Sequence, residues 1–312
     1  MPLRHVLAAL LVASRVSTLE AWGSSGHEIV GQVAEELLSE GGKGYVANIL
    51  GNESLVTIAN WADTITRTQP WSMGLHFINV EECTSAVFAD RQKRSGLDQL
   101  LGSTACTFTY SRDCVGDSCV AGAIANYTGR LSSAVDLYTD LKFLTHFVGD
   151  AHQPLHCARA EDKGGNTISP VFYDVTDQGG EWDLHQIWDF GMIENHVAAS
   201  FGGDASLFGE SLVKAVKEGG EYYDKVEDWT SCLPSSSVEC SSLWGQESVD
   251  LSLSQAYVDV TGEQITANFT VTDEYVEARI EVVSERLAQA GVRLAQLIEA
   301  LAGGEIGGEI RK

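Results

Sequence analysis

The stretch "HFVGDAHQPLH", residues 146–156, closes a largely apolar run that begins at Leu131, and it combines a helical pattern with chemically active side chains. His146 and Asp150 stand four residues apart, so in a helix both side chains leave the same face. A histidine beside a carboxylate on an apolar helix suits zinc, which takes nitrogen and oxygen ligands. Residues 131–156 are therefore predicted to form a long helix that carries a metal site, with Pro154 bending or ending it.

A second stretch, "WDLHQIWD" (residues 182–189), repeats the arrangement with His185 and Asp189. One such pair is more often a solvated contact on a helix surface, but two pairs together with His156, all among apolar residues, favour metal binding. Two shorter pieces, "NWADTI" (60–65) and "LHF" (75–77), are weak signals alone. The candidate ligands are five histidines and three aspartates: His27, His76, His146, His156, His185, Asp63, Asp150 and Asp189. His152 would point off the His146–Asp150 face and is predicted to be structural.

The remaining pattern predicts a mainly α fold in one domain, a multi-helix bundle. Helical apolar spacing covers residues 28–50, and residues 275–301 have the pattern of a strong amphipathic helix. The segment "TISPVFYDV" (167–175) favours a strand or small hairpin. Two segments rich in Ser, Cys and Gly, residues 83–129 and 230–254, are predicted to be long disulfide-tied loops, and residues 302–312 a disordered tail.

The first 21 residues differ in composition from the rest of the chain. Two basic residues precede the short apolar run Val6 to Ala13, and Ala21 offers a small residue for cleavage, as in a secretory signal peptide. The alternative, a membrane anchor, is disfavoured because the run is too short to span a bilayer. Seven cysteines agree with an oxidising compartment; Cys114 and Cys119 make a plausible pair, the other pairings stay open, and one thiol is left over.

The chain is strongly acidic, with a formal net charge of −24. Such a chain cannot hold duplex nucleic acid by a general basic surface. If its substrate is a polyanion, a local feature has to supply the positive charge.

Taken in order, the motifs resemble one family. They run from Trp22 to about Ile298 and are "WGSSGH", "NWADTI", "LHFI", "HFVGDAHQPLH", "DKGGNTI", "LHQIWD" and "AGVRLAQLI". This combination resembles the secreted zinc-dependent single-strand nucleases of fungi and plants, the S-one/P-one nuclease family. The resemblance implies a zinc-dependent nuclease domain over residues 22–301, after a signal peptide at 1–21.

The resemblance also implies three zinc ions and assigns their ligands. Cleavage before Trp22 would free an amine that binds one zinc together with the Trp22 carbonyl oxygen, His27 and Asp150. The second ion would take Asp63, His76, His146 and Asp150, so Asp150 would bridge two ions. The third would take His156, His185 and Asp189. The glycines of "WGSSGH" would let the backbone turn tightly enough to place both ends of this motif on one ion.

Asp63 is the candidate catalytic residue, because a metal ligand beside the attacking water can orient it or take its proton. For the substrate pocket, Phe77 matches the stacking aromatic residue of the family and Asn166 a base-contacting residue. Asn79 stands where the fungal enzymes have an aspartate, which changes the hydrogen-bond code. Arg67 follows the position where a basic residue is usual, and it either replaces that residue or faces solvent.

The implied activity is hydrolysis of single-stranded DNA and RNA to 5′-phosphate products, together with dephosphorylation of 3′-mononucleotides. We expect a monomer that is secreted or held in a lysosome-like or vacuole-like compartment, with no membrane contact after signal cleavage. Two alternatives remain: a zinc-dependent phospholipase C, and an inactive secreted protein stabilised by metals. Lipid hydrolysis would indicate the first, and any zinc-dependent turnover would exclude the second.

Overall fold

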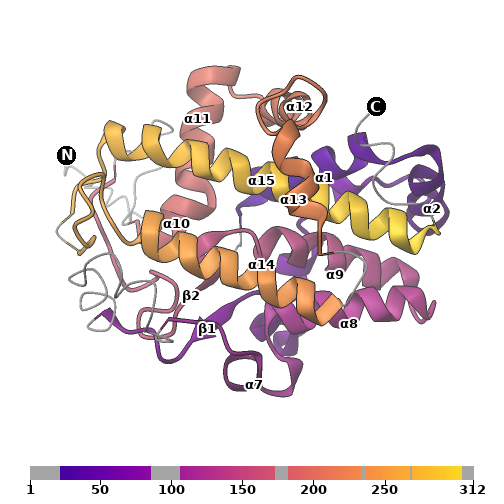
Figure 1. Ribbon diagram of the computed structural model, residues 1–312, viewed down its shortest axis with the longest axis horizontal. Coiled ribbons are helices and arrows are strands. Elements are labelled where there is room, and N and C mark those ends of the chain that lie inside the picture. Colours follow the sequence, from indigo (N-terminus) through magenta and orange to yellow (C-terminus); the bar gives the residue numbers. More distant parts are fainter. Residues whose placement is uncertain (1–21, 86–105, 173–181, 233–236, 268, 304–312) are drawn as a thin grey trace, which may run out of the picture.

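The long C-terminal helix α15 (Asp273–Leu301) is the element against which most of the other helices pack. This computed structural model describes residues 22–85, 106–172, 182–232, 237–267 and 269–303. Helix α15 crosses the molecule beside α14 (Ser237–Leu251) and runs antiparallel to it (Figure 1). Helix α1 (Ser24–Leu37) lies along its other side, and Gly291 permits this approach because a β-carbon there would overlap Val33. The predicted amphipathic helix at residues 275–301 is confirmed.

The secondary structure is mostly helical, which confirms the predicted fold class. Among the described residues, the α-helices besides α1 and α15 are α2 (Glu40–Leu50), α3 (Leu55–Ile58), α4 (Trp61–Ile65), α7 (Tyr110–Asp113), α8 (Val120–Ser132), α9 (Leu137–Asp150), α10 (Leu184–Gln186), α11 (Met192–Phe201), α12 (Ala205–Val216), α13 (Val226–Thr230) and α14 (Ser237–Leu251). The shorter 3₁₀ and π turns are η1 (Pro70–Leu75), η2 (Val115–Asp117), η3 (Pro154–His156), η4 (Ile187–Gly191), η5 (Tyr223–Lys225) and η6 (Ser252–Ala256). No helix in the described part of the chain combines the length and apolar character needed to cross a membrane.

Helix α9 is the buried centre of the site-bearing half. It packs against α8, α15 and α1, and every residue from Asp140 to Asp150 is buried. Helix α9 is shorter at both ends than the helix predicted for residues 131–156. It begins at Leu137 because Asp136 caps it, accepting a hydrogen bond from the Thr139 N–H. It ends at Asp150, and Gln153, the residue before Pro154, is extended, as the proline requires.

The predicted helical segment 28–50 is divided into α1 and α2. Leu38 is extended, and Ser39 starts the second helix by accepting a hydrogen bond from the Gly42 N–H. The Ser39 backbone N–H also donates to the Glu299 carboxylate at 2.6 Å. This break follows from the N-cap preference of serine combined with a tertiary contact to α15.

The small sheet is a parallel pair, β1 (Ile78–Val80) and β2 (Cys157–Arg159), with Ile78 opposite Cys157. The predicted strand or hairpin at 167–175 is wrong for the residues that the structure describes: from 167 to 172 there is one isolated bridge, between Val171 and Thr270, and residues 173–175 lie outside the description. The β-branched residues there pair with distant backbone, as in the 2.7 Å hydrogen bond from the Leu184 N–H to the Ile168 carbonyl.

Three disulfides join Cys83 to Cys106, Cys114 to Cys119, and Cys232 to Cys240. The predicted Cys114–Cys119 pair is confirmed, the leftover thiol is the buried Cys157, and the bridges are those of a protein from an oxidising compartment.

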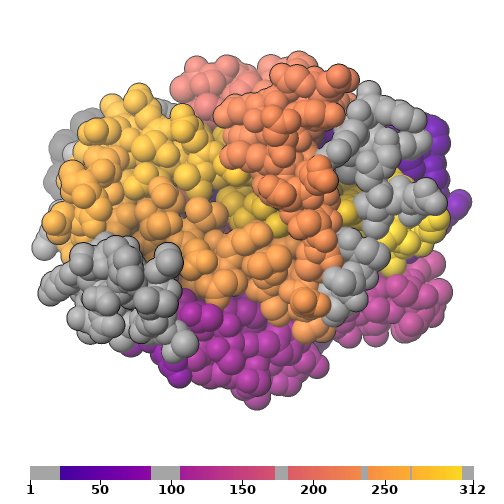
Figure 2. Space-filling model, viewed as in Figure 1, coloured from indigo at the N-terminus to yellow at the C-terminus, as the bar shows by residue number. Residues whose placement is uncertain are grey.

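The two predicted disulfide-tied loops, however, contain α7, α8 and α14. Their small residues allow close helix packing rather than loop structure. A β-carbon at Gly245 of α14, for example, would lie 2.7 Å from the Ile78 side chain. Figure 2 shows the resulting surface, with residues of α13 to α15 in orange and yellow above those of α7 and α8 in purple. The predicted signal peptide and most of the predicted tail lie outside the described residues.

Candidate metal centre

The eight candidate ligands converge from separate segments onto one buried site. His27 comes from α1, Asp63 from α4, His146 and Asp150 from α9, and Asp189 from η4. The other three are His76 just after η1, His156 at the end of η3, and His185 in α10. The parallel β1–β2 pair holds two of these segments together, because β1 begins two residues after His76 and β2 directly after His156.

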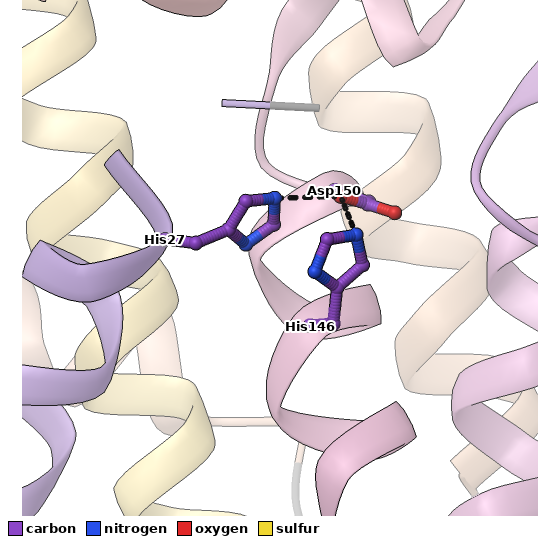
Figure 3. Close-up of side chains that lie close together, drawn as sticks. All are labelled: His27, His146 and Asp150. Atoms are coloured by element: carbon purple, nitrogen blue, oxygen red, sulfur yellow. Dashed lines mark ion pairs between the residues drawn. The ribbon is translucent and has the colours of Figure 1, made fainter. Parts of the chain in front are cut away.

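The first group is His27, His146 and Asp150 (Figure 3). Nε2 of His27 lies 3.2 Å and Nε2 of His146 3.4 Å from Oδ1 of Asp150, and the two rings stack with centroids 3.8 Å apart. Gly149 makes room for this arrangement, since a β-carbon there would lie 2.7 Å from Nδ1 of His27. A helix residue next to Asp150 has to be glycine for α1 to bring His27 this close.

The second group is Asp63, His76 and His146. Oδ1 of Asp63 lies 3.5 Å from Nδ1 of His76 and 3.3 Å from Nε2 of His146. The same Nδ1 atom is 2.9 Å from Oδ2 of Asp150. Asp150 thus directs one carboxylate oxygen toward each of the first two groups, the position that a bridging ligand requires.

The third group is His156, His185 and Asp189. The two Nε2 atoms are 3.0 Å apart, and Oδ2 of Asp189 lies 3.3 Å from Nε2 of His185. The other carboxylate oxygen, Oδ1, accepts a hydrogen bond from the side chain of Gln153 at 2.5 Å. One oxygen of Asp189 therefore faces the histidines while the other is held by protein.

Backbone carbonyls determine the orientation of three imidazoles. Nδ1–H donates at 2.7 Å in each case, from His146 to Ala59, from His156 to His76, and from His185 to Gly164. Because a carbonyl only accepts, Nδ1 carries the proton and Nε2 is left facing the centre, as metal-binding histidines require.

Burial and neighbouring groups shift the pKa values of His27, His146 and His185 strongly. Burial, with the nearby His146, lowers the pKa of His27 to about 4, and burial with His156 lowers that of His185 to about 3. Burial opposes the charge on His146 as well, but the Asp150 and Asp63 carboxylates outweigh it and raise its pKa to about 9. The low pKa values keep the imidazoles of His27 and His185 neutral near pH 7, the form that binds metals.

Several buried polar atoms at the centre have no hydrogen-bond partner: both ring nitrogens of His27, Nε2 of His76, and Oδ1 of Asp63 and of Asp150. Leaving such an atom unsatisfied costs about 1–3 kcal/mol. Cations placed among these atoms would satisfy the carboxylate oxygens and one ring nitrogen of His27, since an imidazole offers a metal ion a single lone pair. Imidazole with carboxylate is a donor set that suits zinc. The residues present therefore fit three metal ions, one for each group.

A pocket of about 480 Å³ opens beside the third group. Its lining includes three of the four predicted substrate residues, Phe77, Asn79 and Asn166, together with His156 and His185. Arg67 is exposed in the turn after α4 and does not line the pocket, which favours the solvent-facing alternative.

The pocket also includes residues that were not among the sequence candidates, Lys163, Thr167, Leu155 and Asp183. Of these, Lys163 and Thr167 belong to the quoted "DKGGNTI" motif, where the charge of Lys163 was the signal that could have identified it. Gln153, which holds Asp189, was missed in the same way within "HFVGDAHQPLH".

Trp22 and His152 are both buried, and neither is among the eight side-chain candidates. Trp22 is fully buried, and the N–H of the next residue, Gly23, donates to the Asp189 carbonyl at 2.8 Å. His152 points away from the ligands, as predicted: its Nδ1–H donates to the Val148 carbonyl, and its Nε2 accepts from Arg293 at 2.9 Å.

A helical chain in which imidazoles and carboxylates form three adjoining groups has the kind of centre that metal-dependent phosphoesterases use.

The family model "S1/P1 Nuclease" matches residues 22–303. Over 304 aligned residues the chain is 33% identical to Endonuclease 2 of Arabidopsis thaliana, covering 91% of this chain and 92% of that protein. It is 31% identical to Nuclease S1 of Aspergillus oryzae (strain ATCC 42149 / RIB 40), with coverage of 90% and 92%. To Nuclease P1 of Penicillium citrinum it is 30% identical, with coverage of 91% and 99%.

The chain belongs to the S1/P1 nuclease family, and it is a hydrolase of ester bonds.

Proposed function

We propose that the protein is a zinc-dependent endonuclease that hydrolyses single-stranded DNA and RNA to 5′-phosphate products and also dephosphorylates 3′-mononucleotides. The observation that carries the proposal is the convergence of all eight candidate side chains into three groups whose ligand atoms lie within 4.8 Å of one another. Nitrogen and oxygen ligands in closed groups suit zinc. The relatives named Nuclease S1 and Endonuclease 2 support nucleic acid as the substrate.

Bound zinc ions would polarise the phosphate and lower the pKa of a water molecule, and they would supply the positive charge that a chain of net charge −24 otherwise lacks. Asp63 is suited to hold the attacking water. Its side chain is 10% exposed, whereas those of His76, His146 and Asp150 are at most 2% exposed, so it lies at the open edge of the centre. Its carboxylate can orient the water or accept its proton.

Trp22 would complete the first group after cleavage of residues 1–21, leaving residues 22–301 as the nuclease domain. The family match begins at this residue, which supports the boundary. The hydrogen bond from the Gly23 N–H to the Asp189 carbonyl would hold the new N-terminus beside the centre. The turn into α1 is tight at Gly26, where a β-carbon would lie 2.7 Å from the Trp22 Cβ, so His27 can reach the same ion.

The 480 Å³ pocket would hold one base of the substrate. Phe77 offers a face for stacking, a contact worth about 1–3 kcal/mol per base. Asn79 and Asn166 offer amide groups for the base edge; the Asn166 amide nitrogen donates to the Lys163 carbonyl at 2.7 Å, which leaves its oxygen as an acceptor. A base reaches such a pocket only from a strand that is not paired, so the pocket would favour single strands.

The three disulfides support an oxidising destination. The mature chain would be secreted or held in a lysosome-like or vacuole-like compartment, and it would act as a monomer with no membrane contact.

The decisive experiment compares protein that begins at Trp22 with protein that begins at Ala21. A peptide-bond nitrogen is not basic, so the longer form should lose the amine ligand and hold about two zinc ions rather than three, since closed structural sites need about four ligands. Metal content and hydrolysis of single-stranded DNA, RNA, 3′-AMP and phosphatidylcholine are measured for both forms. The proposal predicts zinc-dependent turnover of the first three substrates, with the Trp22 form far more active.

Full activity of the Ala21 form would refute the role of the Trp22 amine. Turnover of phosphatidylcholine alone would indicate a phospholipase C, and no turnover at all would indicate the inactive binding protein.

A further inference from the structure

Lys163 has a backbone conformation that a lysine rarely adopts. Its φ is 55°, in the left-handed region, and it is followed by Gly164 at 66° and Gly165 at 88°. A residue with a β-carbon is strained in this region, whereas glycine is not. The turn itself is required, because it brings the Gly164 carbonyl onto Nδ1 of His185. The fold therefore needs the turn, but glycine at position 163 would form it without strain. The presence of a lysine there is not explained by the fold.

The position of Lys163 supplies that explanation. It lines the 480 Å³ pocket together with Phe77, Asn79 and Asn166, and no other lysine or arginine does so among the described residues. Within the described part of the chain, its ammonium group makes no ion pair. Asp183, the acidic residue of the same lining, uses its carboxylate to accept the Gln186 N–H at 2.8 Å.

We propose that Lys163 binds a phosphate of the single strand next to the one being cleaved, and so makes the protein favour polynucleotides over mononucleotides. The inference rests on the proposed function. A base seated between Phe77 and Asn166 would bring the adjoining backbone past the pocket rim, where Lys163 is exposed. Lysine is a compact point charge on a flexible stem, well suited to a phosphate that passes at the rim. A 3′-mononucleotide carries only the reacting phosphate, so it would gain nothing from this contact.

The test uses mature protein with Lys163→Gln and Lys163→Gly. Lys43→Gln, at an exposed position on α2, is the matched control for the loss of one positive charge. Arg67→Gln tests the other nearby cation. For each form, kcat and KM are measured with oligo(dT) and with 3′-AMP at 0.05–0.2 M salt.

Removing one phosphate contact on a single strand lowers the slope of log KM against log salt by about 0.7. If the contact contributes nothing at about 1 M salt, that slope corresponds to an increase in KM for oligo(dT) of about eightfold at 0.05 M and about threefold at 0.2 M salt. The kcat stays the same, and KM for 3′-AMP changes by less than about twofold, because the contact lies outside the reacting phosphate.

The melting temperature of Lys163→Gly separates substrate binding from a purely structural role. Because glycine relieves the strained turn, this variant should melt at the same temperature as the unaltered protein or higher, while its KM for oligo(dT) rises. If Lys163 served only the structure, the variant would melt at a lower temperature. An unchanged salt slope in both Lys163 variants would overturn the inference, as would an equal rise in KM for 3′-AMP or the full effect in Arg67→Gln. Failure of the unaltered protein to hydrolyse oligo(dT) would instead refute the proposed function, so the two failures are distinguishable.

Discussion

Gln153 links two parts of the metal centre, and its replacement by leucine tests how the third group is held. The side chain is fully buried. Its amide nitrogen donates to Oδ1 of Asp189 at 2.5 Å, and its amide oxygen accepts the Leu155 N–H at 2.5 Å. Leucine has a similar size but can make neither bond. The Asp189 carboxylate would then be free to turn away from His185, and a buried N–H would be left unpaired.

The structure indicates the size of both effects. Losing a hydrogen bond to a metal ligand typically lowers metal affinity about 10–100-fold. In this chain the loss should affect one metal ion of the three, because Asp189 is the only candidate ligand to which the Gln153 side chain donates a hydrogen bond. The unpaired Leu155 N–H should also lower the stability of the metal-free protein by about 1–3 kcal/mol.

The assay is a zinc titration of the mature protein against a competing chelator, with thermal unfolding of the metal-free form. Gln296→Leu is the matched control. Gln296, on α15, is buried like Gln153, but its side-chain amide donates to the Thr230 carbonyl and not to a metal-site residue. We expect both variants to be destabilised and only Gln153→Leu to lose affinity for one ion. If each of the three sites bound zinc as tightly in Gln153→Leu as in Gln296→Leu, the reasoning would be refuted.

Removing zinc with a chelator should lower the melting temperature as well as abolish activity, because the ions bind only the folded chain and join distant segments; an unchanged melting temperature with zinc confirmed absent would contradict this. Asp150→Asn should reduce zinc content more than Asp63→Asn, since Asp150 lies between two groups, and metal analysis showing full occupancy in Asp150→Asn would disprove the bridging role. Phe77→Ala should weaken substrate binding by about 1–3 kcal/mol per base without changing zinc content. Asn79→Asp should alter relative rates among the four 3′-mononucleotides more than the overall rate; identical relative rates would show that Asn79 does not contact the base.

Local sequence patterns were sufficient for the features that depend on a single helix. The pairs His146–Asp150 and His185–Asp189 were predicted because a spacing of four residues places side chains on one helical face in any context. The amphipathic helix α15 and the Cys114–Cys119 bridge were predicted for the same reason, since both depend on residues close in the chain. The resemblance to the nuclease family added the grouping of ligands, which spacing alone does not give.

Features that depend on contacts between distant segments were missed or wrong. The sheet was expected as a hairpin near residue 170, but it forms between β1 and β2, where Ile78 pairs with Cys157. The small residues of α8 and α14 were interpreted as loop, because composition does not show that a neighbouring helix packs against them. Strand pairing and helix packing depend on which surfaces meet, and that is not a local property.

The sequence by itself therefore determined the class of fold, the ligand types and the chemistry they favour, because these follow from residue identity and helical period. Only the tertiary structure decided which oxygen of Asp150 faces which group, that Gln153 holds Asp189, and that Lys163 rather than Arg67 lines the pocket. The reason is physical. A site of this kind is fixed by distances of a few ångströms between segments that are far apart in the chain, and those distances exist only once the helices have packed around α15.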